Sequence, residues 1–232
     1  MERHPLTEPR PGEARAQVVR VTAGPVTVEG DLVIPANAQG IVLFAHGSGS
    51  SRHSSRNRYV ARVLQGSGLA TLLIDLLTAS EEAEDIHTAE FRFDIGLLAE
   101  RVAGATDWLR KQPATAHLAV GCFGASTGAA AALVAAASRP EVIRAVVSRG
   151  GRPDLAGSAL PYVQAPTLLI VGGNDTGVIE LNRDALDQLG ADTKQLVIVP
   201  GATHLFEEPG TLEEVARLAA DWFARHLGGG TT

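Results

Sequence analysis

Two hydrophobic patterns divide the chain into an N-terminal hairpin and a longer series of buried elements. Residues 17–23 and 26–34 alternate apolar and polar side chains on either side of Gly24-Pro25, which predicts an antiparallel hairpin at the edge of a sheet. Continuous apolar runs follow, as expected for parallel strands covered on both faces, at residues 41–45, 69–74, 118–122, 142–148, 167–171 and 195–199.

Helical patterns fall between these runs. They cover residues 57–65, 94–110, 127–138, 179–189 and 211–227. The alternation predicts an α/β fold with a mostly parallel sheet of about eight strands and helices on both faces. We expect a loop over residues 76–92. The last helix has the clearest apolar stripe, and Thr211 with Glu214 predicts a capping box at its start.

The composition narrows the class of protein. The 232 residues, 45% of them apolar, are enough for one domain with a large core, which we expect over residues 17–227. We expect a flexible arm over residues 1–16 and a disordered tail over residues 228–232. The formal net charge of -6 argues against nucleic-acid binding, and no apolar run is long enough to span a membrane.

The N-terminus and the cysteine content bear on location. The first residues are polar and proline-rich, without the apolar segment of a signal peptide. The single cysteine excludes an internal disulfide framework. The expected location is therefore the cytoplasm, in a soluble form.

One serine stands at a turn with the properties of a nucleophile elbow. Gly124-Ala125-Ser126-Thr127-Gly128 matches GxSxG, with an apolar run before it and a run of helix-forming residues after it. Glycines at 124 and 128 suit a turn in which strand and helix approach closely. The alternative is an ordinary glycine-bounded turn whose serine only caps a helix.

A serine nucleophile needs a base, and the base needs a carboxylate. Ligands of open α/β sheets bind beyond the carboxyl ends of the strands, so the residues after each apolar run are the candidates. Asp175 follows the run at residues 167–171, and His204 follows the run at residues 195–199. The order Ser126, Asp175, His204 is the order required of a fold that carries this elbow.

Other residues of the same types remain open as alternatives. The competing bases are His46, His53 and His87. The competing acids are Asp75 and Asp154, of which Asp154 is the better placed because it follows the preceding apolar run. Taken alone, His204 would be better explained as a capping or core histidine, and Asp175 as a turn residue before a helix.

The glycine-rich loop after residues 41–45 offers a backbone donor. We expect the oxyanion to be bound by the amides of Thr127, at a helix N-terminus, and of Ser48. The alternative is a nucleotide-binding loop, but Arg52 stands where the dinucleotide fingerprint has its third glycine. No cofactor is therefore expected. No metal is expected either, because His87 with Glu90 lacks the further ligands of known sites.

Several arginines lie in loops at the same edge. Arg52, Arg56, Arg149 and Arg152 are there, and we expect the first three to bind a substrate carboxylate or phosphate. The alternative is a rim of ion pairs with the acidic residues that follow residue 80. The segment between residues 148 and 167 is too short for a helical cap domain, which favours small acyl groups.

These motifs together resemble those of a known superfamily. Phe44-Ala45-His46-Gly47-Ser48-Gly49, the serine turn, Gly172-Gly173-Asn174-Asp175 and Gly201-Ala202-Thr203-His204 resemble the α/β-hydrolase superfamily, and specifically dienelactone-hydrolase-like proteins. The resemblance covers residues 17–227 and implies an esterase or related acyl hydrolase that uses no cofactor. Dienelactone hydrolases proper have a cysteine at the elbow, where this chain has Ser126, so the resemblance does not imply lactone hydrolysis.

The sequence therefore predicts a serine hydrolase of small carboxylic esters that acts through an acyl-enzyme. Its substrate would be a small molecule, anionic esters included, and a homodimer is left open. One alternative is acyl transfer or thioester cleavage by the same three residues. Another is a non-catalytic accessory domain that keeps the fold.

Overall fold

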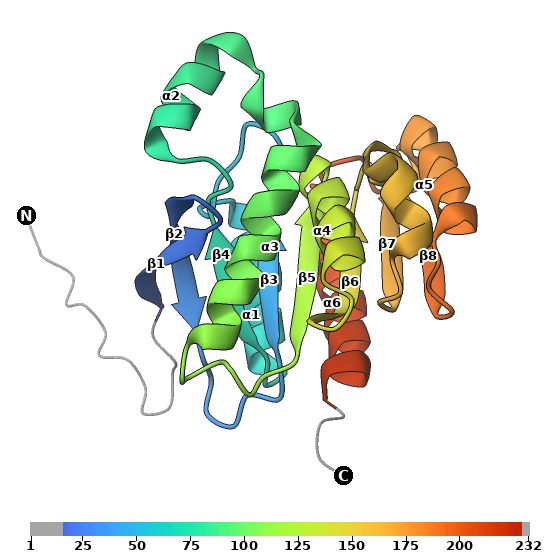
Figure 1. Ribbon diagram of the computed structural model, residues 1–232. Coiled ribbons are helices and arrows are strands. Elements are labelled where there is room, and N and C mark those ends of the chain that lie inside the picture. Colours follow the sequence, from blue (N-terminus) through green and yellow to red (C-terminus); the bar gives the residue numbers. More distant parts are fainter. Residues whose placement is uncertain (1–15, 229–232) are drawn as a thin grey trace, which may run out of the picture.

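The structure is a computed structural model that describes residues 16–228, and its centre is one eight-stranded sheet (Figure 1). The strands lie in the order β1-β2-β4-β3-β5-β6-β7-β8, which confirms the number predicted. Their bounds are β1 Gln17–Ala23, β2 Val26–Val33, β3 Ile41–Ala45, β4 Ala70–Ile74, β5 Val120–Ala125, β6 Ile143–Arg149, β7 Thr167–Gly172 and β8 Lys194–Val199.

The N-terminal hairpin forms as predicted. β1 pairs with β2 in antiparallel register, with Val21 opposite Val28, and β2 pairs antiparallel with β4. Strands β3 to β8 are parallel to one another. The carboxyl ends of these strands therefore meet at one edge of the sheet, where the loops that carry the candidate residues begin.

Helices cover both faces of the sheet (Figure 1). The α-helices are α1 Ser55–Gly66, α2 Ala79–Thr88, α3 Ile95–Lys111, α4 Thr127–Ser138, α5 Thr176–Gln188 and α6 Thr211–Leu227, with 3-10 segments η1 Phe91–Phe93 and η2 Pro153–Tyr162. Alternate residues of a strand point to opposite faces, and β3 illustrates the result. Leu43 packs in the core beneath α3, α4 and α5, whereas Val42 and Phe44 pack in the core beneath α1 and α6.

The segment after β4 contains a helix, so the prediction of a loop over residues 76–92 is wrong. Thr78 caps α2, accepting a hydrogen bond from the amide of Glu81, while the Glu81 carboxylate accepts one from the amide of Thr78. This reciprocal pair satisfies two helix-end donors, which stabilises a short polar helix. At the top of Figure 1, α2 lies beyond the end of the sheet. Asp85 and Arg92 anchor it, with an Oδ2–Nε distance of 2.5 Å.

The capping box expected at the start of α6 does not form. Gly210 occupies the N-cap position in a left-handed conformation, with φ of 83°. The Thr211 hydroxyl donates instead to the carbonyl of Glu208, and Glu214 pairs with Arg217. The helix itself begins and ends where the sequence predicts, at residues 211 and 227.

The described part of the chain contains no large cap domain. Between β6 and β7 the chain forms only η2, which is kinked at Gly157. Among residues 16–228, no helix combines the length and the apolar character needed to cross a membrane. The arm expected over residues 1–16 and the tail over residues 228–232 lie outside the described residues, apart from Ala16 and Gly228.

Helix α4 packs unusually close to the strands beneath it. A Cβ added at Gly128 would overlap the carbonyl oxygens of Ala45 and His46, and one at Gly124 would overlap the backbone of Ala129. The alanines that follow Gly128 are fully buried, so the helix faces the sheet with side chains of one carbon. Close packing is therefore a requirement at this point of the fold.

We predict that Gly128→Ala lowers the free energy of unfolding by about 1–3 kcal/mol or more, because backbone atoms must move to admit the methyl group. Gly177→Ala in α5 is the matched control, since nothing lies within 4 Å of its added Cβ. The control should change stability by less than about 1 kcal/mol, in the stabilising direction. Urea unfolding measures both, and equal stability of the two variants would contradict the prediction.

Candidate active site

Ser126 stands in a strained turn between β5 and α4. Its backbone has φ of 51° and ψ of -123°, a conformation that non-glycine residues rarely adopt and that costs on the order of 1–3 kcal/mol. The Ser126 amide donates to the carbonyl of Arg149 at 3.4 Å, and its carbonyl accepts from the amide of Arg152 at 3.1 Å. The end of β6 therefore holds the turn in place. The predicted elbow geometry is present.

His204 and Asp175 lie against each other on two neighbouring loops. Asp175 follows β7 and precedes α5, and His204 lies in the loop after β8. The His204 Nδ1 atom lies 2.7 Å from the Asp175 Oδ2 atom. A backbone bond of 2.9 Å from Asn174 to the carbonyl of Ala202 joins the two loops. With Nδ1 donating to the carboxylate, the Nε2 atom of His204 is available to a second partner.

Ser126 and His204 line the same cavity. Its volume is about 270 Å³, and its other lining residues are Gly47, Ser48, Ser50, Ser54, Arg56, Asn57, Ala125, Arg149 and Leu205. Among the described residues, no hydrogen bond joins the Ser126 hydroxyl to the imidazole of His204 in this conformation. Such bonds often tighten only when a substrate binds, so the shared cavity is the informative observation.

The two residues expected to bind an oxyanion contact each other. The Ser48 amide donates to the Thr127 hydroxyl oxygen at 3.0 Å. Thr127 is the first residue of α4, where an amide has no acceptor within the helix. A Cβ at Gly47 would lie 3.0 Å from the Ser126 Cβ, so this loop passes directly over the turn. In this conformation the Ser48 amide is therefore already paired, with the Thr127 hydroxyl.

The competing acids pair with arginines, and the competing bases lie outside the cavity of Ser126. Asp154 pairs with Arg152 at 2.7 Å, and Asp75 pairs with Arg52. The rings of His46, His53 and His87 do not line the cavity of Ser126 as the structure describes it. Of the four candidate histidines, His204 is the one that lines this cavity in the described part of the chain, and Asp175 is the carboxylate in contact with it.

The structure separates the predicted arginines. Arg52 lies in an ion-pair network with Glu29 at 2.6 Å, Asp31 at 3.4 Å and Asp75, so the structure does not bring it to Ser126. Arg56 does line the cavity.

Arg149 also lines the cavity, and it is 94% buried beside Ser126. Burial, and then the nearby charge of Arg56, lower the pKa of Arg149 to about 10, which leaves it charged at neutral pH. Asn57, which accepts a hydrogen bond from Arg149, was not predicted because no motif marks its position.

Cys122 is fully buried in β5, as predicted for a small apolar residue. Burial raises the pKa of its thiol to about 12, so the thiol stays protonated and unreactive. Within the described range, no group of three or more His, Cys, Asp and Glu side chains could hold a metal ion.

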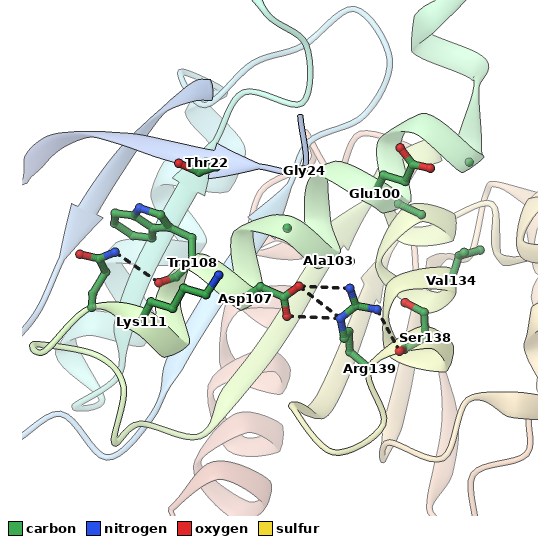
Figure 2. A pocket seen from close by; sticks show the side chains of 14 residues that line it. Thr22, Gly24, Glu100, Ala103, Asp107, Trp108, Lys111, Val134, Ser138 and Arg139 are labelled. Atoms are coloured by element: carbon green, nitrogen blue, oxygen red, sulfur yellow. Dashed lines mark hydrogen bonds and ion pairs between the residues drawn. The ribbon is translucent and has the colours of Figure 1, made fainter. Parts of the chain in front are cut away.

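A larger hollow lies away from the serine turn. It has a volume of about 840 Å³ and opens between α3, the C-terminal half of α4 and the hairpin turn at Gly24 (Figure 2). Asp107 and Arg139 form an ion pair of 3.1 Å on its surface. Since Ser126 precedes the N-terminus of α4, this hollow is at the opposite end of that helix. Its lining contains neither Ser126 nor His204.

The strand order, the hairpin and the serine turn define an α/β-hydrolase fold. The model of the dienelactone hydrolase family matches residues 28–227, and the chain belongs to that family. Family and fold support a hydrolase activity.

Solved structures agree with this assignment. A dienelactone hydrolase from Anabaena variabilis ATCC 29413 is 65% identical, with a TM-score of 0.91 over 93% of this chain and 99% of that chain. Est1E from Butyrivibrio proteoclasticus has a TM-score of 0.74 and 16% identity over 90% of this chain and 98% of that chain, which shows a common fold alone.

Two curated relatives come from strains of Mycobacterium tuberculosis. Each is named "Putative phosphoribosyl transferase" and is 62% identical over 215 residues. The match covers 93% of this chain but 47% of each relative, so the chain spans about half of their length.

His46 gives a prediction for stability. Its Nδ1 atom donates to the Gly47 carbonyl at 2.9 Å, and its Nε2 atom accepts from the Leu76 amide at 3.0 Å. Burial lowers the pKa of His46, an effect that outweighs the opposing influence of the Gly47 carbonyl, Asp75 and Glu82. The folded protein therefore resists a proton that the unfolded chain takes up near pH 6.5, and stability is lost as the pH falls.

We predict that the free energy of unfolding falls more steeply with decreasing pH in the wild type than in His46→Asn, which does not titrate. Between about pH 6.5 and pH 5, the difference in slope should approach about 1.4 kcal/mol per pH unit. Urea unfolding at a series of pH values measures both slopes. Parallel slopes would show that the imidazole of His46 titrates alike in the folded and unfolded states.

Proposed function

We propose that this protein is a serine hydrolase that cleaves small carboxylic esters, with Ser126 as nucleophile, His204 as general base and acid, and Asp175 as the partner of His204. The observation that carries the proposal is the His204–Asp175 pair of 2.7 Å beside a cavity that also contains the strained Ser126 turn. A serine hydroxyl needs such a base to react at neutral pH.

The proposed reaction has two stages. In the first, Ser126 Oγ attacks the ester carbonyl carbon while His204 Nε2 takes the hydroxyl proton. The tetrahedral intermediate then expels the alcohol, which receives that proton from His204, and an acyl-serine ester remains. In the second, water attacks the acyl-enzyme, gives its proton to His204 and releases the acid as Ser126 recovers its proton. The Asp175 carboxylate stabilises the imidazolium in both stages.

The oxyanion would be bound by backbone amides. The Thr127 amide points from the N-terminus of α4, where the helix dipole favours negative charge. The Ser48 amide would join it by exchanging the Thr127 hydroxyl, 3.0 Å away, for the oxyanion. Each such donor is typically worth about 3–4 kcal/mol of transition-state stabilisation.

The dimensions of the cavity favour small substrates. Its volume of about 270 Å³ is near the lower end of the roughly 300–1,000 Å³ found for small-molecule sites. Leu205 is the one aliphatic side chain larger than alanine among its lining residues in the described chain. A long acyl chain would therefore find little apolar surface, which supports short acyl groups.

The name of the Mycobacterium tuberculosis relatives does not favour a transferase here. The hydrolase family model accounts for residues 28–227, and the chain spans 47% of those relatives. We infer that the phosphoribosyl transfer in their name belongs to the part that this chain does not share. Acyl transfer, thioester cleavage, a homodimer and the cytoplasmic location stay predictions from the sequence.

We predict that Ser126→Ala lowers the rate of p-nitrophenyl acetate hydrolysis by at least about 1,000-fold and abolishes covalent labelling by a fluorophosphonate probe. Ser67→Ala, at the exposed end of α1, is the control and should keep both. Labelling of Ser126→Ala would rule out Ser126 as the nucleophile. An unlabelled, inactive wild type would favour the accessory-domain alternative.

A further inference from the structure

Arg149 carries a buried charge without a carboxylate partner. Arg149 is 94% buried, and within the described chain no carboxylate oxygen lies within 4.0 Å of its guanidinium group. Its Nη2 atom donates to the amide oxygen of Asn57 at 3.2 Å, and its buried Nε atom has no partner. The ring of Phe206 lies 6.0 Å from its guanidinium carbon. A buried charge left in this state is costly, and a ligand that supplies negative charge would offset the cost.

The N-terminus of α1 meets Arg149 at the same cavity. Ser54 caps this helix of 12 residues, and its first turn contains no acidic residue. Ser54, Arg56 and Asn57 all line the cavity. A helix N-terminus presents amides without acceptors and a partial positive charge, and both favour an anion.

The cavity as a whole has an excess of positive charge. Its lining residues include two arginines and no carboxylate. Arg56 has one ion pair, at 3.2 Å, and its partner Glu207 is exposed on the rim. The Nε atom of Arg56 is buried without a partner, like that of Arg149. A group with two negative charges would balance both guanidinium groups and still accept amide hydrogen bonds from the helix.

We propose that this cavity contains a phosphate subsite, formed by Arg149, Arg56 and the first turn of α1, and that the natural ester also carries a phosphate monoester. The identity of the reacting group rests on the proposed hydrolase function, but the subsite does not. The tetrahedral phosphate offers three oxygens to two guanidinium forks and the helix amides, and at pH 8 it carries two charges. Because Arg149 pairs in the sheet with Ala125, next to Ser126, the phosphate would sit close to the ester.

Binding is tested without turnover. Inorganic phosphate is titrated by calorimetry at pH 8 and constant ionic strength into three variants. One is Ser126→Ala, and the other two combine Ser126→Ala with either Arg149→Met or Arg62→Met. Arg62, an exposed residue of α1 outside the cavity, controls for the loss of one positive charge. Phosphate should bind Ser126→Ala, and Arg149→Met should weaken its binding by at least about tenfold. Arg62→Met should leave binding within about twofold, because its charge is solvated.

Selectivity is tested with p-nitrophenyl esters of one short acid that carries a phosphate, a carboxylate or a hydroxyl group at the same position. The kcat/KM ratio of phosphate to hydroxyl ester should exceed about tenfold, and Arg149→Met or Arg56→Met should reduce it to near one. Arg149→Lys should keep part of the preference, because the charge remains without the planar fork. Thermal unfolding of each variant checks that it folds, and Arg56→Met carries the test if Arg149→Met does not fold.

The outcomes separate this subsite from the proposed function. If the wild type cleaves no ester but phosphate binding depends on Arg149, the subsite stands and the hydrolase proposal fails. If it cleaves the neutral ester without preference, and phosphate does not bind, the subsite is wrong and the hydrolase proposal stands. A carboxylate ester cleaved better than the phosphate ester would also overturn the assignment.

Discussion

The close approach of α4 to strands β3 and β5 is the constraint on which the site depends. Gly128 lies against the backbone of residues 45 and 46, and this contact leaves no room for a wider turn. The chain must reverse within Ser126, whose φ of 51° is the local cost. In return, the serine stands at the N-terminus of a helix and beside the loop of Gly47. Global packing thus maintains a conformation that the residue would not adopt alone.

Much of the fold was predictable because continuous apolar runs, once bounded by turn residues, specify buried parallel strands. The same rule failed for α2, since a short helix beyond the sheet has a polar sequence. Its signal was nevertheless present, in the capping pair of Thr78 and Glu81. The equivalent pattern of Thr211 and Glu214 predicted a capping box that does not form. Gly210 takes the N-cap position instead, and its left-handed conformation determines how the chain enters α6.

The candidate site was predictable as far as topology determines it. Parallel strands bring Asp175 and His204 to one edge in any such sheet, and the structure places their side chains 2.7 Å apart. The sequence could not show which of the arginines reach the cavity, since all of them lie in loops at the same edge of the sheet. Three carboxylates on β2 and at the end of β4 engage Arg52, whereas Arg149 is buried without one. That difference depends on side chains from distant strands, which no local pattern records.

The most direct test asks whether Ser126, His204 and Asp175 act as one unit. The measurement is kcat for p-nitrophenyl acetate in Ser126→Ala, in His204→Ala and in the double variant, each checked for folding. If the serine reacts only through the imidazole, the double variant should be no slower than the slower single variant. If instead the two losses multiply, Ser126 and His204 act independently, and a shared proton path between them is contradicted.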